Sequence, residues 1–453
     1  MTYWALEVFL YKRTQVRRNV RAIFARFLRP LRNPCALCGY NIFKCMSTQD
    51  FESKLLHVAY DRPDAYNALS MPVYNAVAYE FSSAEEMEQV FCGQAPGHYY
   101  SRVTNPTVAY FEERVRAVTG AISATASNSG MAAISDMLMT IAYAGANIVT
   151  SYNLYGNTYS LMKNVFTPFG LELRICDLKN PADVRSNIDE HTCAVFVETI
   201  SNPQLEVVDL KSLSAICREL NVPLIADTTV VPFCAFDAKS FGVNIEIISA
   251  TKYLSGGATS TGGLILDYGT FDWGYSKALK PWYEKFGLEA FTARMKKEIN
   301  RSMGSYMTPQ VAYMQTLGLE TLKLRFERQA STCLELATRL LRFESVNYPG
   351  LKNNPYYEIS TAQFGQYPGA MLTFDLPSRE ACFAFINRLK LIRRATNLFD
   401  NRSLIIHPAS TIYGTFTPEQ RQKMNVREET IRLSVGLESV DDLCGDLFDC
   451  LEV

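Results

Sequence analysis

The stretch Ile245-Glu-Ile-Ile-Ser-Ala-Thr-Lys252-Tyr-Leu-Ser-Gly-Gly257 joins a short apolar strand to a polar loop that carries one lysine. Similar short apolar runs flank it in the chain, at 147–150, 171–175, 193–197, 223–226 and 263–266. Most of these runs are separated by segments of helix length, such as 158–166 and 210–220. This alternation predicts an α/β fold with a mostly parallel sheet that is covered by helices on both faces.

The pattern changes after about residue 300. A long amphipathic helix is expected over 317–341, followed by a strand at 369–374 and a helix at 380–390. We therefore expect a second, smaller α/β domain at the C-terminus. The predicted organisation begins with a basic leader outside the fold at 1–45 and an arm for subunit contacts at 46–108. The large domain follows at 109–305 and the smaller domain at 306–453.

Composition excludes several classes of protein. The net charge is −1, and the first 45 residues hold nine basic residues against one acid, so the remainder is mildly acidic and unsuited to a nucleic-acid groove. No apolar run is long enough to span a bilayer. We interpret the leader as an upstream translated stretch, in preference to a targeting segment.

Cysteine and histidine usage indicates the compartment and argues against a metal site. The twelve cysteines are scattered, which is typical of reduced cysteines in a cytoplasmic protein. Cys35 and Cys38 have half of a zinc spacing, but no second pair follows at ligand distance. The four histidines lie far apart in sequence, so no metal is expected.

Four polar features stand at the ends of predicted strands or at the start of a helix, where ligands bind in open α/β sheets. They are the turn 127–131, Tyr155, Asp227 and Lys252. Each alone has an ordinary interpretation as a helix start, a cap or a solvated lysine. Together they provide N–H donors for a phosphate, an aromatic platform, a carboxylate and an amine, which are the groups that pyridoxal phosphate (PLP) requires.

Six ordered segments resemble the Cys/Met-metabolism family of PLP-dependent enzymes. The resemblance covers nearly everything from about Ser47 to the C-terminus. It implies the aspartate-aminotransferase-like fold, with a mostly parallel seven-stranded sheet in the large domain. The segments are 100–107, 129–133, 154–156, 249–257, 407–410 and 432–438.

The resemblance also implies roles around the cofactor. Lys252 would be the Schiff-base residue, Asp227 would pair with the pyridine nitrogen, and Asn202 would lie near the ring oxygen. Tyr155 would stack on the ring and act as acid or base. The phosphate would be held by Gly130, Met131, Ser249 and Thr251.

Further implied roles concern the substrate and a second subunit. Arg432 would clamp the substrate carboxylate bidentately, with help from Asn397. Tyr100 and Arg102 would reach the phosphate of a neighbouring subunit. This implies a homo-oligomer, by family habit a tetramer, with active sites shared between subunits.

Within the family, three segments resemble O-acetylhomoserine sulfhydrylases: 271–273, 318–325, and 397–398 ahead of 404–408. The implied reaction is γ-replacement, in which O-acetyl-L-homoserine and sulfide (or methanethiol) give homocysteine (or methionine) and acetate. The alternatives are a methionine or cystathionine γ-lyase, a cystathionine γ-synthase, and a non-catalytic relative retained as an assembly or regulatory subunit. Asn157 stands where methionine γ-lyases usually carry a cysteine, which argues against the first of these.

Two stretches depart from the family pattern. Gly257-Ala258-Thr259 replaces a run of the Gly-His-Gly type, and Phe399 stands where a glycine is commoner. We expect both to lie near the substrate entrance.

Overall fold

A computed structural model describes residues 50–58, 66–342 and 346–451 of the chain. The leader and the Cys35–Cys38 pair lie outside these residues. Residues from Phe51 onward form one compact unit. Among the described residues, no helix is both long enough and apolar enough to cross a membrane.

A seven-stranded sheet forms the centre of the larger layer, in the order β1-β7-β6-β5-β4-β2-β3. Strands β2 to β6 run parallel to their neighbours among themselves, and β7 runs antiparallel to both β1 and β6. The predicted α/β class and mostly parallel sheet are confirmed. The strands are Ser123–Ser127, Asn147–Thr150, Glu172–Ile175, Thr192–Glu198, Leu224–Asp227, Ile245–Ile248 and Gly263–Asp267, for β1 to β7.

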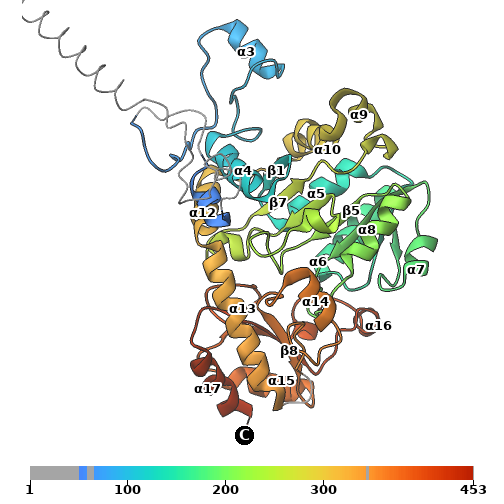
Figure 1. Cartoon of the computed structure of the whole chain (residues 1–453), viewed down its shortest axis with the longest axis vertical. Coiled ribbons are helices and arrows are strands. Elements are labelled where there is room, and N and C mark those ends of the chain that lie inside the picture. The colour runs from blue at the N-terminus through green and yellow to red at the C-terminus, as the bar shows by residue number, and fades with distance from the viewer. Residues whose placement is uncertain (1–49, 59–65, 343–345, 452–453) are drawn as a thin grey trace, which may run out of the picture. The chain divides into compact units, whose positions relative to one another are not determined.

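Burial on both faces explains why these strands read as continuous apolar runs. In β4, Val195 and Val197 belong to one hydrophobic cluster, whereas Ala194 and Phe196 belong to another. Successive strand residues point to opposite faces, so both faces are packed. Helices around this sheet include α4 (Pro106–Thr119), α5 (Gly130–Ile141), α6 (Gly156–Ser160), α7 (Pro181–Ser186), α8 (Leu210–Glu219), α9 (Lys280–Phe286) and α10 (Ala290–Arg294) (Figure 1).

A second sheet of four strands lies in the C-terminal part, in the order β8-β11-β10-β9. Its strands are β8 (Met371–Asp375), β9 (Arg393–Arg394), β10 (Leu404–Ile406) and β11 (Thr430–Ser434). Figure 1 shows the long helix α13 (Leu322–Arg339) running from the larger sheet toward this smaller one. The remaining longer helices here are α14 (Tyr357–Phe364), α15 (Arg379–Arg388), α16 (Pro418–Lys423) and α17 (Val440–Leu451).

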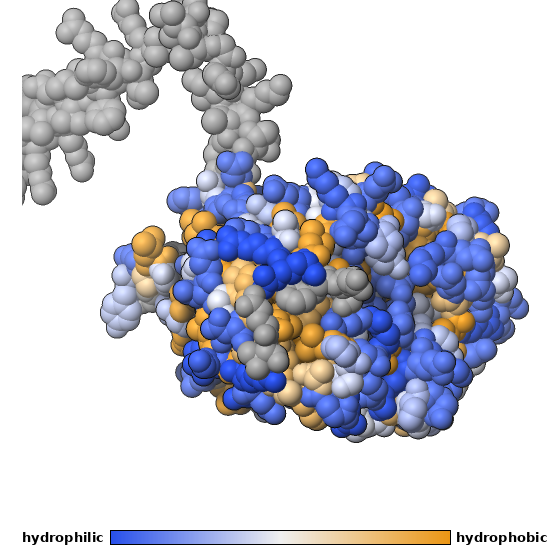
Figure 2. All heavy atoms as spheres, turned by 90° about the horizontal axis from the view of Figure 1, so that it is seen from below, coloured by the Kyte–Doolittle hydropathy of each residue, from blue (hydrophilic) through white to orange (hydrophobic). Residues whose placement is uncertain are grey.

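The N-terminal part of the described chain is sparse in regular structure. It holds α2 (Phe51–Leu56) and α3 (Ala84–Phe91), and residues 66–83 ahead of α3 are mostly irregular. The surface seen from below the orientation of Figure 1 is mostly hydrophilic, with apolar patches between the polar groups (Figure 2).

Two elements differ from the sequence-based expectation. The single helix expected over 317–341 is two helices, α12 (Pro309–Glu320) and α13, which meet at Thr321. The Arg325 guanidinium bonds to the Gly318 carbonyl at 2.6 Å and so satisfies an acceptor at the end of α12. Strand β1 was not expected, because Ser-Ala-Thr-Ala-Ser lacks the branched apolar residues typical of strands.

Candidate active site

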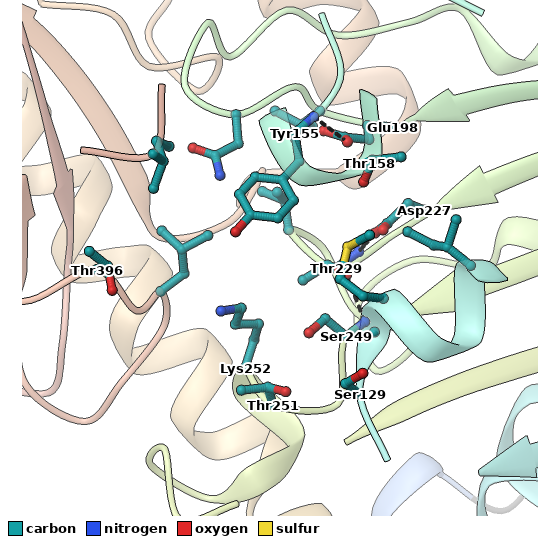
Figure 3. Close-up of a pocket in the computed structure, with 18 of the residues that line it drawn as sticks. Ser129, Tyr155, Thr158, Glu198, Asp227, Thr229, Ser249, Thr251, Lys252 and Thr396 are labelled. Carbon is teal, nitrogen blue, oxygen red and sulfur yellow. Dashed lines mark hydrogen bonds between the residues drawn. The ribbon is translucent and has the colours of Figure 1, made fainter. Parts of the chain in front are cut away.

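A cavity opens beyond the carboxyl ends of β4, β5 and β6 and is closed on the other side by residues from the C-terminal part (Figure 3). Nine of the twelve predicted site residues line it, namely Gly130, Met131, Tyr155, Asn202, Asp227, Ser249, Thr251, Lys252 and Arg432. This agrees with the rule that ligands bind outside the carboxyl ends of parallel strands.

Lys252 follows β6 and points into the cavity (Figure 3). Its Nζ donates to Asn397 Oδ1 at 2.9 Å, which brings Asn397 to the site although it does not line the cavity. Burial and the nearby positive charge of Arg432 lower the pKa of Lys252 to about 8, against the opposing effect of Asp227. The amine is therefore much closer to neutrality at physiological pH than an ordinary lysine.

Asp227 ends β5, and Glu198 ends the neighbouring strand β4 directly opposite it. Asp227 Oδ1 accepts from the Thr229 N–H at 2.9 Å, and Glu198 Oε1 accepts from the Tyr155 N–H at 2.6 Å. Burial raises the pKa of both carboxyl groups, and the charge of Asp227 further raises the pKa of Glu198. Hydrogen bonds from Thr229, and after them the charge of Lys252, oppose the shift at Asp227, so Glu198 holds the proton of the pair and Asp227 carries the charge.

The N-terminus of α5 forms a small-residue cradle beside Ser249. Ser129 caps the helix by accepting from Ala132 N–H at 3.1 Å. A Cβ atom at Gly130 would lie only 2.8 Å from Ser249 Cβ, so glycine keeps this space open. Free N–H groups at a helix N-terminus bind anions such as phosphate. Thr229 Oγ1, which accepts from Ser249 N–H at 2.8 Å, ties the cradle to Asp227.

Arg432 enters from β11 of the smaller sheet and is only 2% exposed. Its Nη1 donates to Asn202 Oδ1 at 3.0 Å, and its Nη2 lies 3.4 Å from the carbonyl oxygens of Thr396 and Asn397. The Nε atom has no partner within the described part of the chain. Burial lowers the pKa of Arg432 to about 10. A buried guanidinium that lines a cavity and keeps one N–H donor unpaired suits a carboxylate ligand.

Tyr155 precedes α6 and directs its ring into the cavity from the side opposite the Lys252 loop (Figure 3). Burial raises the pKa of its phenol, which Arg432 partly counteracts. Asn157 donates to the Tyr155 hydroxyl at 3.2 Å. The ring therefore remains a neutral, proton-bearing group at physiological pH.

Tyr100 and Arg102 do not line this cavity. Tyr100 is 40% exposed, and the Arg102 guanidinium lies over its ring at 5.2 Å and donates to the Arg301 carbonyl. Their expected contact with a second subunit stays a prediction. His407 is 2% exposed and its ring bonds to Ser410 Oγ and the Glu428 carbonyl, which is a packing arrangement.

Several residues at the site were missed in the sequence. Glu198 directly follows the apolar run 193–197, and an acid after a strand is the same signal that identifies Asp227. Thr229, Thr158 and Thr396 line the cavity but carry no distinctive pattern. Phe399 was expected near the entrance; the adjoining Leu398 lines the cavity, whereas the Phe399 side chain itself is fully buried and stacks on Tyr253.

The residues that line this cavity include no histidine and no cysteine. No cluster of three or more His, Cys, Asp or Glu side chains able to hold a metal occurs in residues 50–58, 66–342 and 346–451. The nine cysteines in those ranges are free thiols, and most of them are buried.

Three features of the cavity fit pyridoxal phosphate. The cradle at Gly130, which a Cβ would fill, suits the phosphate group. The charged Asp227 suits a protonated ring nitrogen, and the largely desolvated Lys252 amine suits covalent attachment to an aldehyde.

Comparisons with known proteins agree with this fit. Residues 52–452 match the family described as Cys/Met metabolism PLP-dependent enzyme. An O-acetyl-L-homoserine sulfhydrylase of Thermus thermophilus is 37% identical over 418 residues, which cover 88% of this chain and 99% of that protein. The homocysteine synthase of Schizosaccharomyces pombe is 32% identical, with 90% of this chain and 99% of the relative covered.

A solved structure has a similar fold. A Campylobacter jejuni protein, provisionally assigned as an O-acetylhomoserine (thiol)-lyase, superposes with a TM-score of 0.85 at 31% identity, covering 89% of this chain and all of that one. That structure carries a lysine joined to pyridoxal phosphate. The chain described here therefore belongs to the Cys/Met metabolism family of PLP-dependent enzymes.

Proposed function

We propose that the chain catalyses γ-replacement, converting O-acetyl-L-homoserine and sulfide to homocysteine and acetate. The observation that carries this proposal is the arrangement in one cavity of Lys252, Tyr155 and Arg432, with the Arg432 Nε unpaired. An amino-acid substrate needs a carboxylate clamp, a base and an acid around the cofactor. The O-acetyl-L-homoserine sulfhydrylase and the homocysteine synthase among the similar proteins support this choice of substrate and sulfur donor.

We assign the cofactor contacts by chemistry. Gly130, Met131, Ser249 and Thr251 would hold the phosphate, Asp227 the ring nitrogen, and Asn202 the region of the ring oxygen. Bound pyridoxal phosphate supplies an electron sink that makes the substrate Cα–H acidic. Asn202 also accepts from Arg432, so it orients the clamp beside the ring.

The chain's own groups bind the substrate and transfer protons. Arg432 binds the substrate carboxylate with two N–H donors, and Asn397 contributes beside it. The Lys252 amine, whose pKa of about 8 leaves a sizeable neutral fraction near pH 7, takes the Cα proton and later returns it. Tyr155 holds a proton on its phenol on the opposite side of the cavity. The Cγ–O bond to acetate breaks and a Cγ–S bond forms, so acetate leaves and H₂S supplies the sulfur.

A substrate panel tests the proposal. The purified chain with pyridoxal phosphate is incubated with O-acetylhomoserine, O-succinylhomoserine, cystathionine or methionine, each with and without sulfide. We expect homocysteine only from O-acetylhomoserine with sulfide. Formation of 2-oxobutyrate without sulfide would identify a γ-lyase, and turnover of none of them would indicate a non-catalytic relative.

Replacement of Lys252 tests its role directly. We expect Lys252→Ala to lose turnover by roughly a thousandfold or more, because positioned proton transfer and covalent attachment both disappear. The visible absorbance of the lysine-bound cofactor should vanish as well. Lys163→Ala, at an exposed helical lysine, is the matched control and should retain both. Retention of absorbance and turnover in Lys252→Ala would disprove the assignment.

We further propose a homotetramer in the cytoplasm. In it, Tyr100 and Arg102 would complete the phosphate site of a neighbouring copy, and 46–108 would serve as the arm. The exposed position of Tyr100 and the absence of Tyr100 and Arg102 from the cavity lining of their own chain support this. The free cysteines support a reducing compartment. The large and smaller domains would be 109–305 and 306–453, each built on one of the two sheets.

A further inference from the structure

The segment 396–398 touches the two groups that the proposed reaction depends on most. Asn397 Oδ1 accepts from Lys252 Nζ at 2.9 Å, and the carbonyl oxygens of Thr396 and Asn397 face Arg432 Nη2 at 3.4 Å. A shift of this short segment would therefore displace the base and the carboxylate clamp together. The contacts that hold this segment involve Phe399 and Tyr253, which do not line the cavity.

Phe399, the next residue, is held in an unusual conformation. Its backbone φ is +55°, a region that a bulky residue rarely adopts, yet its side chain is fully buried. Its ring stacks on Tyr253 with centroids 4.2 Å apart and planes inclined by 8°. Its N–H donates to Ser434 Oγ at 2.7 Å. The surrounding contacts thus enforce a conformation that would otherwise relax.

Tyr253 is the neighbour of Lys252 in the chain and is itself fixed on three sides. Its carbonyl accepts from Arg325 Nη1 at 2.7 Å, and its hydroxyl accepts from Ala370 N–H at 3.1 Å. Its ring also packs edge-on against Phe326. The Tyr253–Phe399 stack therefore joins the lysine loop to the segment that faces Arg432.

A second contact joins the same two loops. Asn401 Nδ2 donates to the Gly256 carbonyl at 2.9 Å, and a Cβ at Gly257 would lie 2.2 Å from Asn401 Nδ2. Gly257 thus makes room for Asn401. The two stretches that depart from the family pattern therefore lie on the same pair of packed loops, with Gly257 against Asn401 and Phe399 against Tyr253.

We infer that the Tyr253–Phe399 stack is a positioning device that sets the place of segment 396–398, and with it the affinity of the site for the carboxylate of an amino acid. This inference rests on the proposed function, because it takes Arg432 as the carboxylate clamp. Neither aromatic ring lines the cavity, so both act through Asn397 and Arg432.

The test measures amino-acid binding separately from turnover. The holoenzyme is titrated with L-norvaline, which has the amine and carboxylate of the substrate but no leaving group, and the change in visible absorbance yields Kd. We expect Phe399→Leu and Tyr253→Leu each to raise this Kd about tenfold, because a small displacement of a positioning segment weakens every contact it makes. The KM for O-acetylhomoserine should rise in parallel, while kcat changes less.

Matched variants separate positioning from general packing. Tyr253→Phe keeps the stack but loses the hydroxyl that accepts from Ala370 N–H, so it should raise the Kd for L-norvaline by clearly less than Tyr253→Leu does. Phe291→Leu breaks another buried aromatic stack, with Trp273, and should lower the unfolding temperature without changing Kd. The double variant Tyr253→Leu/Phe399→Leu should bind no more weakly than the worse single variant, because both changes remove one interaction.

An unchanged Kd in Phe399→Leu, with an unfolding temperature lowered as in Phe291→Leu, would overturn the inference. If Phe399→Leu does not fold, Phe399→Met keeps the buried volume without the flat ring and is judged by the same Kd criterion. Wild-type protein that binds L-norvaline but turns over no substrate would contradict the proposed function alone. The Kd values of the variants for L-norvaline would still show whether the Tyr253–Phe399 stack positions segment 396–398.

Discussion

At the residue scale, the site depends on charges held where water cannot reach them. Burial lowers the pKa of both Lys252 and Arg432, and the positive charge of Arg432 lowers the pKa of Lys252 further. The carboxyl pair Glu198 and Asp227 lies opposite them. Such mutual perturbation is typical of catalytic groups and gives predictions that can be measured.

The depressed pKa of Lys252 predicts a pH-dependent cost to the cofactor-free fold. Below about pH 8 the amine is protonated in the folded and unfolded chains alike, and its burial disfavours the fold by about 3 kcal/mol. Between pH 8 and the ordinary lysine pKa of 10.5 only the unfolded chain keeps the proton, so this cost disappears as pH rises. Lys252→Met should therefore be the more stable chain at pH 7.

The measurement is denaturant unfolding of the cofactor-free wild type and Lys252→Met from pH 7 to pH 10. The stability advantage of the variant should shrink with rising pH. Lys163→Met, at an exposed lysine, should show no such trend. A difference that is constant across this range would contradict the shifted pKa.

Glu198 is predicted to work as a neutral acid. Because its pKa is raised, Glu198→Gln reproduces the neutral side chain and keeps an acceptor for the Tyr155 N–H. We expect kcat/KM to change by less than about threefold in this variant. Glu198→Ala leaves the buried N–H unpaired and should cost roughly tenfold to a hundredfold. Equal losses in both variants would show that the ionised carboxylate is needed.

At the element scale, the strand ends and one helix terminus place the groups. Strands β4 and β5 bring Glu198 and Asp227 into register, and the cap at Ser129 starts α5 beside Ser249. The segment 127–131 was predicted as an anion-binding turn from its small residues. The strand β1 before it could not be predicted, because it pairs with a strand far away in the sequence. The separation runs from 136 positions for Ser127 and Gly263 to 144 for Ser123 and Asp267.

The cradle at the start of α5 should tolerate no side chain. Gly130→Ala would place a methyl 2.8 Å from Ser249 Cβ, so we expect the Kd for pyridoxal phosphate to rise by roughly tenfold or more. Equilibrium dialysis or absorbance titration of the cofactor-free chain measures it. Gly445→Ala is the control, since a Cβ there meets nothing within 4 Å and the residue lies inside α17. That variant should leave the Kd unchanged and slightly stabilise the helix.

At the scale of the whole molecule, the cavity lies where two sheets contribute to one surface. Lys252 and Asp227 come from the seven-stranded sheet, and Arg432 comes from the four-stranded sheet. The arrangement leaves Tyr100 and Arg102 outside the cavity of their own chain. Whether a second copy of the chain contributes Arg102 to the site can therefore be tested directly.

Complementation between two inactive variants tests the shared site. Lys252→Ala and Arg102→Ala chains carrying different tags are co-expressed, and the mixed oligomer is purified through both tags. Each mixed pair should regain one complete site, with Lys252 from one copy and Arg102 from the other, and hence activity above either variant alone. Arg102→Ala by itself should lose roughly tenfold to a hundredfold. Mixed oligomers no more active than the mixture of separate variants would show that Arg102 serves its own chain.

The sequence by itself determined the fold class and most of the residues around the cavity. Apolar runs of strand length reveal buried parallel strands, and polar residues that follow them must lie at one edge of the sheet, as Asp227 and Lys252 do. These signals depend on residues that are close together in the sequence, so they can be recognised without a structure. The helix break at Thr321 left no such signal, because the carbonyl of Gly318 is satisfied by a side chain four residues beyond the break.

Only the tertiary structure decided what Phe399 and Glu198 do. Phe399 was expected at the entrance, yet it is buried under the lysine loop because Tyr253, 146 positions earlier, offers it a flat surface. The pKa of Glu198 is raised because its carboxyl group is buried and lies in register with Asp227 on the neighbouring strand. Burial and long-range packing set these properties, and neither is encoded in the spacing of residues along the chain.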